Sequence, residues 1–183
     1  MSILFINGCV REPSRTLVLA KSVLKDMCGE VTEVNLNQET IAPLNRELLE
    51  KREAFVHSGN TQDAMFDYAK QFALADDIVI AAPFWDLSFP ALLKAYMEQI
   101  TVAGITFEYR NGRPFGLCKA KRLIYVTTSG GPIFADFGYE YIKALAKNFY
   151  GIQETKAYRA MNLDVDMIGA EEVLTKAEIS VIE

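Results

Sequence analysis

The sequence predicts an α/β fold, a three-layer sandwich in which helices cover both faces of a parallel sheet. Short apolar runs alternate with longer amphipathic segments along the chain, which is the rhythm of βαβ units. The runs at residues 78–82 and 123–126 are apolar at every position, as expected for strands with helices on either side. With 183 residues, half of them hydrophobic, the chain suits one compact domain over residues 1–183.

The apolar pattern places the individual elements. Strands are expected at residues 3–7, 31–36, 78–82, 122–127 and 154–160. Helices are expected at residues 16–27, 45–55, 61–75, 91–102 and 139–150, with a packing helix at 168–183 and a small hairpin around the Asn-Gly turn of 106–113. Right-handed crossovers between five parallel strands favour the order 2-1-3-4-5. The chain then reverses direction between strands 1 and 3, and a crevice opens there.

Composition excludes several classes of function. The net charge of −5, with acids and bases scattered, argues against nucleic-acid binding and against a polybasic membrane anchor. No secretory signal or membrane-length apolar run is visible, so we expect a cytoplasmic protein. Cys9, Cys28 and Cys118 are widely spaced and read as reduced thiols. With His57 as the single histidine, no metal site and no Ser-His-Asp triad are expected.

The loop after the first strand, residues 7–16, has the content of a phosphate seat. A helix is expected to start near Ser14, where free N–H groups and the helix dipole favour an anion. The hydroxyls of Ser14 and Thr16 can donate, and Arg11 or Arg15 can neutralise charge. Alternatively, Ser14 is only an N-cap and the arginines are solvated. The spacing matches neither GxGxxG nor GxxxxGK[ST], so a nucleoside triphosphatase is not expected.

Two further loops reach the same crevice. Residues 82–90 place the only tryptophan beside two phenylalanines at the end of a buried strand, which suits a flat partner, although core packing is the alternative. Residues 127–132 offer hydroxyl and amide donors and two glycines where side chains would block a ligand, although Gly-Gly-Pro is also a plain turn. A flat heteroaromatic that carries a phosphate fits all three loops.

Four segments carry a resemblance to a known family. They are Ser14-Arg15-Thr16, the block from Pro83 to Lys94, the Gly-Ile-Thr-Phe-Glu-Tyr run at 104–109 and Thr128-Ser129-Gly130-Gly131. The helix of residues 141–152 ends in Phe-x-Gly-Ile and continues the match. In order and spacing these segments resemble the flavodoxin-like NAD(P)H:quinone oxidoreductases, and within them the FMN-dependent NADH-azoreductase branch. The fold class implied is therefore flavodoxin-like.

The resemblance implies FMN as cofactor, with NADH or NADPH as electron donor. It implies ping-pong hydride transfer from the nicotinamide to flavin N5 and on to a quinone or azo acceptor, without a catalytic protein residue. The cofactor-binding residues implied are Cys9, Arg11, Ser14, Arg15, Thr16, Pro83, Phe84, Trp85, Asp86, Leu87, Thr128, Ser129, Gly130 and Gly131. Backbone amides of 84–87 and 129–131 would face the two edges of the flavin. A homodimer is implied, with residues 37–60 and 104–118 walling the acceptor pocket.

Two departures from the family pattern concern the flavin and the acceptor. Asp86 stands where the family usually has asparagine, so its carboxylate either points away from the flavin or is held protonated by the apolar loop. No arginine lies between Ser129 and the glycines, which makes the acceptor pocket less cationic. The alternatives are an NAD(P)H-dependent FMN or iron reductase, an electron-carrier flavodoxin, and an interaction protein that has lost its cofactor.

Overall fold

A computed structural model of the chain describes residues 1–164, 174 and 179–182. Its central feature is a six-stranded sheet in the order β2-β1-β3-β6-β7-β8. The strands are β1 (Ser2–Asn7), β2 (Glu30–Asn35), β3 (Asp77–Ala81), β6 (Arg122–Thr128), β7 (Glu154–Ala160) and β8 (Ile179–Ile182). The first five are parallel, and β8 runs antiparallel to β7. The α/β, flavodoxin-like class is therefore confirmed.

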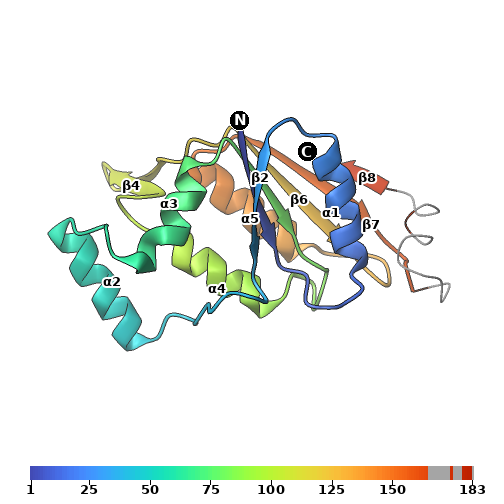
Figure 1. Cartoon of the computed structure of the whole chain (residues 1–183), viewed down its shortest axis with the longest axis horizontal. Helices are drawn as coiled ribbons and strands as arrows, with labels where there is room; N and C mark the ends of the chain where they lie inside the picture. The colour runs from blue at the N-terminus through green and yellow to red at the C-terminus, as the bar shows by residue number, and fades with distance from the viewer. Residues whose placement is uncertain (165–173, 175–178, 183) are drawn as a thin grey trace.

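Helices lie on both faces of this sheet (Figure 1). Helix α1 (Arg15–Lys25) packs on one face, where Leu19 and Val23 meet alternate residues of β1, β3 and β6. Helices α3 (Asp67–Leu74), α4 (Ala91–Ile100) and α5 (Phe137–Leu145) cover the other face. This arrangement follows from the strands, which are buried on both sides and so alternate between two separate cores.

The helices predicted between residues 16 and 150 are confirmed, with shifted ends. Helix α2 (Arg46–Ser58) begins after Asn45, whose side chain accepts from Leu48 N and caps the helix. The helix expected at 61–75 is divided into a 3₁₀ turn, η1 (Ala64–Phe66), and α3. Helix α5 continues into a π-helical turn, η2 (Ala146–Tyr150), which ends at Gly151 with φ 79°. The expected hairpin is present as β4 (Phe107–Arg110) and β5 (Arg113–Gly116).

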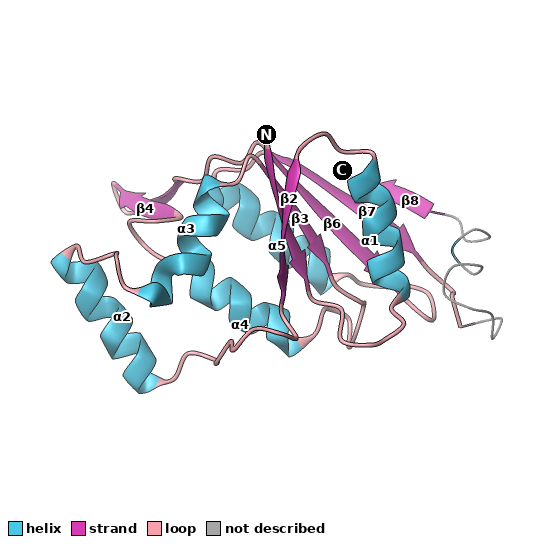
Figure 2. Ribbon diagram, in the orientation of Figure 1, coloured by secondary structure: helices cyan, strands magenta, loops and turns pink. Residues whose placement is uncertain are grey.

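Two predictions about the C-terminal part need correction. The sheet has six strands in the order above, not five in the order 2-1-3-4-5. The packing helix expected at 168–183 lies largely outside the described residues, and it is wrong for Ile179–Ile182, which form β8. Strand β8 lies beside β7 at the edge of the sheet (Figure 2), and its Ile179 and Val181 are exposed. A run of four residues is too short for periodicity to distinguish a strand from a helix.

Candidate cofactor site

The carboxyl ends of β1, β3 and β6 meet at one edge of the sheet, and a cavity of about 280 Å³ opens there. This is the crevice expected where the strand order reverses direction. Ten of the predicted cofactor-binding residues line it, and these are Arg11, Ser14, Arg15, Thr16, Pro83, Phe84, Trp85, Thr128, Ser129 and Gly130. The three loops that the sequence singled out therefore converge on one site.

Four predicted residues do not line the cavity. Cys9 is buried beneath it, with Sγ 3.9 Å from the carbonyl oxygen of Ala81. Asp86 and Leu87 are exposed at the tip of a turn, and Gly131 is exposed as well. Sequence reasoning in turn missed three lining residues, which are Val10, Pro13 and Asp164. The first two belong to the predicted loop, but nothing in the sequence pattern marked Asp164.

At the start of α1 the site presents hydroxyl and amide donors. Ser14 is the N-cap, and its Oγ accepts from Leu17 N at 3.2 Å. Thr16 is buried, and its Oγ1 lies 2.7 Å from Oγ1 of Thr128. One bond between two hydroxyls uses only one of their two protons, so the other can be donated into the cavity. This end of the site therefore suits an anion.

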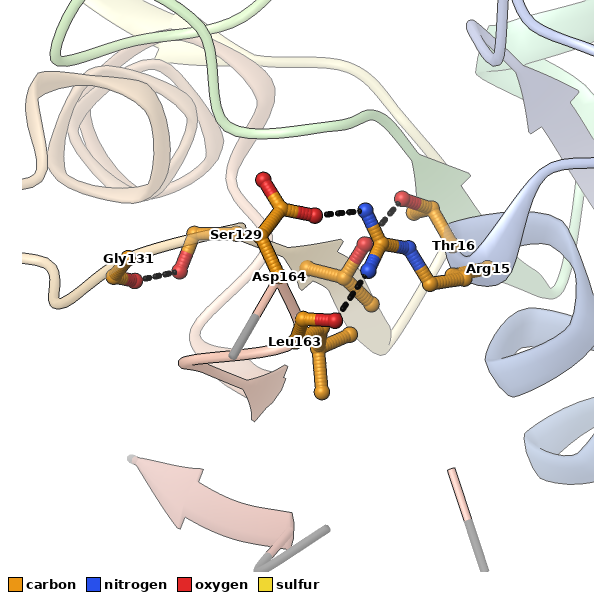
Figure 3. A network of polar contacts seen from close by, with 7 residues as sticks. Arg15, Thr16, Ser129, Gly131, Leu163 and Asp164 are labelled. Atoms are coloured by element: carbon orange, nitrogen blue, oxygen red, sulfur yellow. Dashed lines mark hydrogen bonds and ion pairs between the residues drawn. The ribbon is translucent and has the colours of Figure 1, made fainter. Parts of the chain in front are cut away.

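The two arginines of the first loop differ in their contacts. The Arg11 guanidinium carbon lies 5.9 Å from the centroid of the Trp85 ring, and Arg11 lines the same cavity as Ser14 and Thr16. Arg15 instead forms an ion pair with Asp164 and donates to the carbonyl oxygen of Leu163 (Figure 3). Of the two cations expected at the phosphate seat, Arg15 is paired with a carboxylate, whereas Arg11 forms no ion pair with any carboxylate of the described residues.

The aromatic loop after β3 is a tight two-residue turn. Trp85 N donates to Ser88 O at 3.1 Å, and Ser88 N donates to Trp85 O at 2.7 Å. Asp86 and Leu87 between them have φ values of 50° and 65°. Both central residues of a type I′ turn need positive φ, which asparagine and aspartate tolerate but leucine adopts only with strain. The turn therefore carries a strained residue at its tip, next to the cavity.

Three of the seven backbone amides expected to face the flavin are already bonded within the protein. Phe84 N donates to Thr128 O, Trp85 N to Ser88 O, and Ser129 N to Ala160 O. The other four donate no hydrogen bond within the described part of the chain, and these are the amides of Asp86, Leu87, Gly130 and Gly131. The expected amide donors are thus reduced to two from each loop.

The glycine loop, residues 127–132, is packed against the residues that follow β7. Leu163 N donates to Ser129 O at 3.2 Å, and Asp164 N donates to Gly130 O at 3.1 Å. A Cβ at Gly130 would lie 1.8 Å from Oδ2 of Asp164, whereas a Cβ at Gly131 would meet nothing within 4 Å. A Cβ at Gly130 would therefore require the exposed Asp164 side chain to move, whereas Gly131 has room for a side chain.

We expect the three cysteines to react very differently with an alkylating reagent. Burial raises the pKa of Cys9 to about 11 and that of Cys118 to about 12, whereas Cys28 is exposed. At about pH 8 the Cys9 thiolate is then roughly a thousandth of the thiol, so iodoacetamide should label Cys28 first. Peptide mass spectrometry measures the rates, and urea-unfolded protein, in which all three should react alike, is the control. Rapid labelling of Cys9 in the folded protein would contradict the buried placement.

Other classes of site find little support in the described residues. No group of three or more His, Cys, Asp or Glu side chains is placed to hold a metal ion within that part of the chain. None of the helices described there has the length and apolar character needed to cross a membrane.

Comparison with known proteins agrees with the geometry. A family model described as a flavodoxin-like fold matches residues 1–181. An FMN-dependent NADH:quinone oxidoreductase of Clostridium perfringens is 32% identical over 180 residues, which cover 93% of this chain and 90% of that protein. Another of the same name, from Coprothermobacter proteolyticus, is 34% identical over 84% of this chain and 82% of that protein.

Solved structures show the same fold. An FMN-dependent NADH-azoreductase from Bacillus anthracis, crystallised in complex with FMN, superposes with a TM-score of 0.77 at 24% identity, over 96% of this chain and 93% of that one. The azoreductase AzrA gives a TM-score of 0.76 at 20% identity, over 96% of this chain and 94% of that one. The chain therefore belongs to the flavodoxin-like family that includes the FMN-dependent NADH:quinone oxidoreductases.

Proposed function

We propose that this protein is an FMN-dependent oxidoreductase that takes electrons from NADH or NADPH and reduces quinone or azo acceptors. The observation that carries the proposal is the cavity at the carboxyl edge of the sheet, which joins a hydroxyl-rich helix N-terminus to an aromatic loop and a glycine loop. Relatives with more than 30% identity over most of their length are named as enzymes of this kind. A cytoplasmic location and action as a single domain belong to the same proposal.

The residues present fit FMN at both ends of the site. The first turn of α1, the Ser14 hydroxyl and the spare proton of the Thr16–Thr128 pair suit a phosphate dianion, and Arg11 lies on the same cavity wall. Phe84 and Trp85 supply flat surfaces, and the free amide of Gly130 supplies a donor on the cavity wall, while the free amide of Asp86 lies in the adjoining turn. The volume of about 280 Å³ is near the lower end for ligand sites.

In this proposal the protein binds and orients, and FMN supplies the two-electron chemistry between donor and acceptor. Ser14 and Thr16 hold the phosphate and so fix the position of the ring system relative to the aromatic loop. In the turn at Trp85–Ser88 the unbonded amides are those of Asp86 and Leu87, which would face one edge of the ring, and the amides of Gly130 and Gly131 would face the other. No side chain of the site has to act as a proton donor or nucleophile.

The acceptor pocket is proposed to be completed by a second copy of the chain. Helix α2 has no buried residue and lies at one end of the molecule, away from the sheet (Figure 1). In the same two segments, 37–60 and 104–118, Leu49, Tyr109, Phe115 and Leu117 are exposed. A homodimer would cover these apolar side chains. Sedimentation at micromolar concentration should give twice the monomer mass, and a monomer at all concentrations would contradict this part of the proposal.

The proposed function is tested by the visible absorbance spectrum of the purified protein, taken anaerobically before and after each donor is added. Flavin bands that are bleached by NADH or NADPH, and that return when a quinone or azo compound is added, are the expected result. Bands that persist with both donors would indicate an electron-carrier flavodoxin instead. A protein that stays colourless after incubation with FMN would contradict the proposal altogether.

We expect the Asp86→Asn substitution to change the midpoint potential of the bound flavin by only about 10–20 mV. Asp86 is exposed and does not line the cavity, which favours a carboxylate that points away from the flavin. A unit charge roughly 8 Å away through solvent contributes about 0.5 kcal/mol, and 30 mV of a two-electron couple corresponds to about 1.4 kcal/mol. Asparagine also tolerates the positive φ of this position.

Spectroelectrochemical titration measures this potential, and Asp67→Asn is the control for net charge. Asp67 is exposed, in the first turn of α3. A potential that rises by roughly 60 mV or more in Asp86→Asn alone would show that the carboxylate faces the flavin.

A further inference from the structure

Arg15 lies where a phosphate ligand is expected, but its guanidinium contacts another segment of the protein and so links that segment to α1. It is the first residue of α1 and lines the cavity, yet its guanidinium is turned toward the chain that follows β7. One nitrogen pairs with Asp164, and another donates to the carbonyl oxygen of Leu163. Figure 3 shows the guanidinium between these two oxygens, with both of its polar contacts on the same segment.

We propose that Asp164 and Arg15 are positioning residues of the cofactor site, which together clasp the glycine loop to the N-terminus of α1. The proposal rests on the proposed function, because the ligand that they position is the flavin. It assigns a role to Asp164, which lies after the last parallel strand, and it gives Arg15 a role that does not require direct contact with the phosphate.

The first support is the backbone pairing between the two segments. Residues 162–164 run along the glycine loop, with Leu163 N bonded to Ser129 O and Asp164 N bonded to Gly130 O. Leu163 is buried, so this segment is anchored on its apolar side. Arg15 reaches it from α1, and the glycine loop is thus held between Arg15 and the end of β7. Displacement of residues 163–164 would move Ser129 and Gly130 with them.

The second support is the fit between Gly130 and Asp164. A Cβ at Gly130 would overlap the carboxyl group, with 1.8 Å to Oδ2 and 2.5 Å to Cγ. The space that a side chain would fill at Gly130 is therefore taken by Asp164, whose carboxylate lies against the loop and faces Arg15 (Figure 3). The carboxylate is two-thirds exposed and needs this partner to hold one orientation.

Charge gives the third support. A free carboxylate on the wall of a phosphate site repels the dianion, so an unpaired Asp164 would weaken binding of FMN. The ion pair with Arg15 neutralises this charge, and Arg15 is then no longer available as an unpaired cation for the phosphate. The donors left for the phosphate are the helix N-terminus, the hydroxyls and Arg11, as described above.

The experiment compares FMN with riboflavin, which has the same ring system and no phosphate. Flavin-free wild type, Asp164→Asn, Arg15→Gln and the double variant are titrated with both ligands by flavin fluorescence. If the clasp acts on the glycine loop, both single variants should bind riboflavin roughly fivefold more weakly, and the double variant should be no weaker than the worse single variant. Asp67→Asn, whose carboxylate is 68% exposed against 67% for Asp164, is the matched control and should bind as the wild type does.

The alternative, in which Arg15 binds the phosphate directly, predicts different changes in FMN and riboflavin affinity. If Arg15 binds the phosphate and Asp164 only competes for it, Asp164→Asn should tighten FMN binding and leave riboflavin unchanged, while Arg15→Gln should weaken FMN alone. That pattern overturns the proposal. Riboflavin affinity that is unchanged in both single variants overturns it as well.

Hydrogen exchange in the flavin-free protein tests the clasp without a ligand. The amides of Leu163 and Asp164 should exchange faster in Arg15→Gln and Asp164→Asn than in the wild type, and equal rates overturn the proposal. A wild-type chain that binds neither flavin overturns the proposed function, and exchange at these amides then still decides whether Arg15 and Asp164 hold the loop.

Discussion

An Asp136→Ala protein is expected to be less stable than the wild type by about 3–5 kcal/mol in free energy of unfolding. Asp136 is the N-cap of α5, where its Oδ1 accepts from Tyr139 N at 2.8 Å. Its other oxygen, Oδ2, lies 2.6 Å from Nη2 of Arg159 on β7, and both side chains are almost fully buried. Removing the carboxylate leaves the Arg159 charge buried without its partner, and that unpaired charge is the main cost.

Urea unfolding of two further variants separates the cap from the charge. Asp136→Ser keeps a capping hydroxyl and should lose nearly as much stability as Asp136→Ala, because the cap alone contributes about 1 kcal/mol. Adding Arg159→Met to Asp136→Ser should recover most of the loss, since a buried pair is often replaced by apolar side chains at little cost. A double variant no more stable than Asp136→Ser would show that burial of the charge is not the cause.

This pair also bears on the site, because Asp136 follows the glycine loop in the chain and Arg159 lies next to the residue that accepts from the Ser129 amide of that loop. Asp136 ends the segment that begins at Ser129, and Arg159 precedes Ala160, whose carbonyl oxygen accepts from Ser129 N. Neither Oδ2 of Asp136 nor Nε of Arg159 has a hydrogen-bond partner among the described residues. The two groups are therefore held by charge rather than by aligned hydrogen bonds, and loss of either partner should loosen the glycine loop.

The convergence of the three loops was predictable because it depends on strand order alone. Residues 78–82 and 123–126 are apolar on both faces, which identifies parallel strands, and the carboxyl ends of neighbouring parallel strands share one edge. Phe84 and Ser129 lie at the ends of their strands and Ser14 lies in the loop after the first strand, so their meeting in one cavity follows from topology. The hydroxyls and aromatic rings then indicated a flat ligand with a phosphate.

What the sequence left open depends on contacts between segments that no local pattern connects. Asp164 pairs with Arg15 from a position 149 residues away, so neither residue signals the other. The amide of Phe84 donates to Thr128 O, and the amide of Trp85 donates to Ser88 O within the turn. The first of these bonds depends on the register between β3 and β6, which no local sequence pattern reveals. The edge strand β8 is four residues long, below the length at which periodicity identifies an element.

The Thr16→Val substitution is expected to weaken FMN binding by roughly 10- to 150-fold and riboflavin binding far less. A hydrogen bond to a charged group contributes about 1.5–3 kcal/mol, and each 1.4 kcal/mol is a factor of ten in affinity. Thr16 lies in the first turn of α1, where its proton and the helix N-terminus act on the same anion, whereas Thr128 ends β6. We therefore expect Thr128 to donate to Thr16, and Thr16 to donate to the phosphate.

Thr128→Val removes the same bond between the two hydroxyls but keeps the hydroxyl that donates to the phosphate, so FMN affinity should fall by no more than about fivefold. Thr16→Ser, which retains the hydroxyl, should restore most of the affinity. Fluorescence titration of the three flavin-free variants measures these values, and Thr128→Val that is as weak as Thr16→Val would reverse the direction of the bond. Equal losses for FMN and riboflavin in Thr16→Val would instead mean that the hydroxyl supports the fold of the loop rather than the phosphate, because only a contact with the phosphate can distinguish the two ligands.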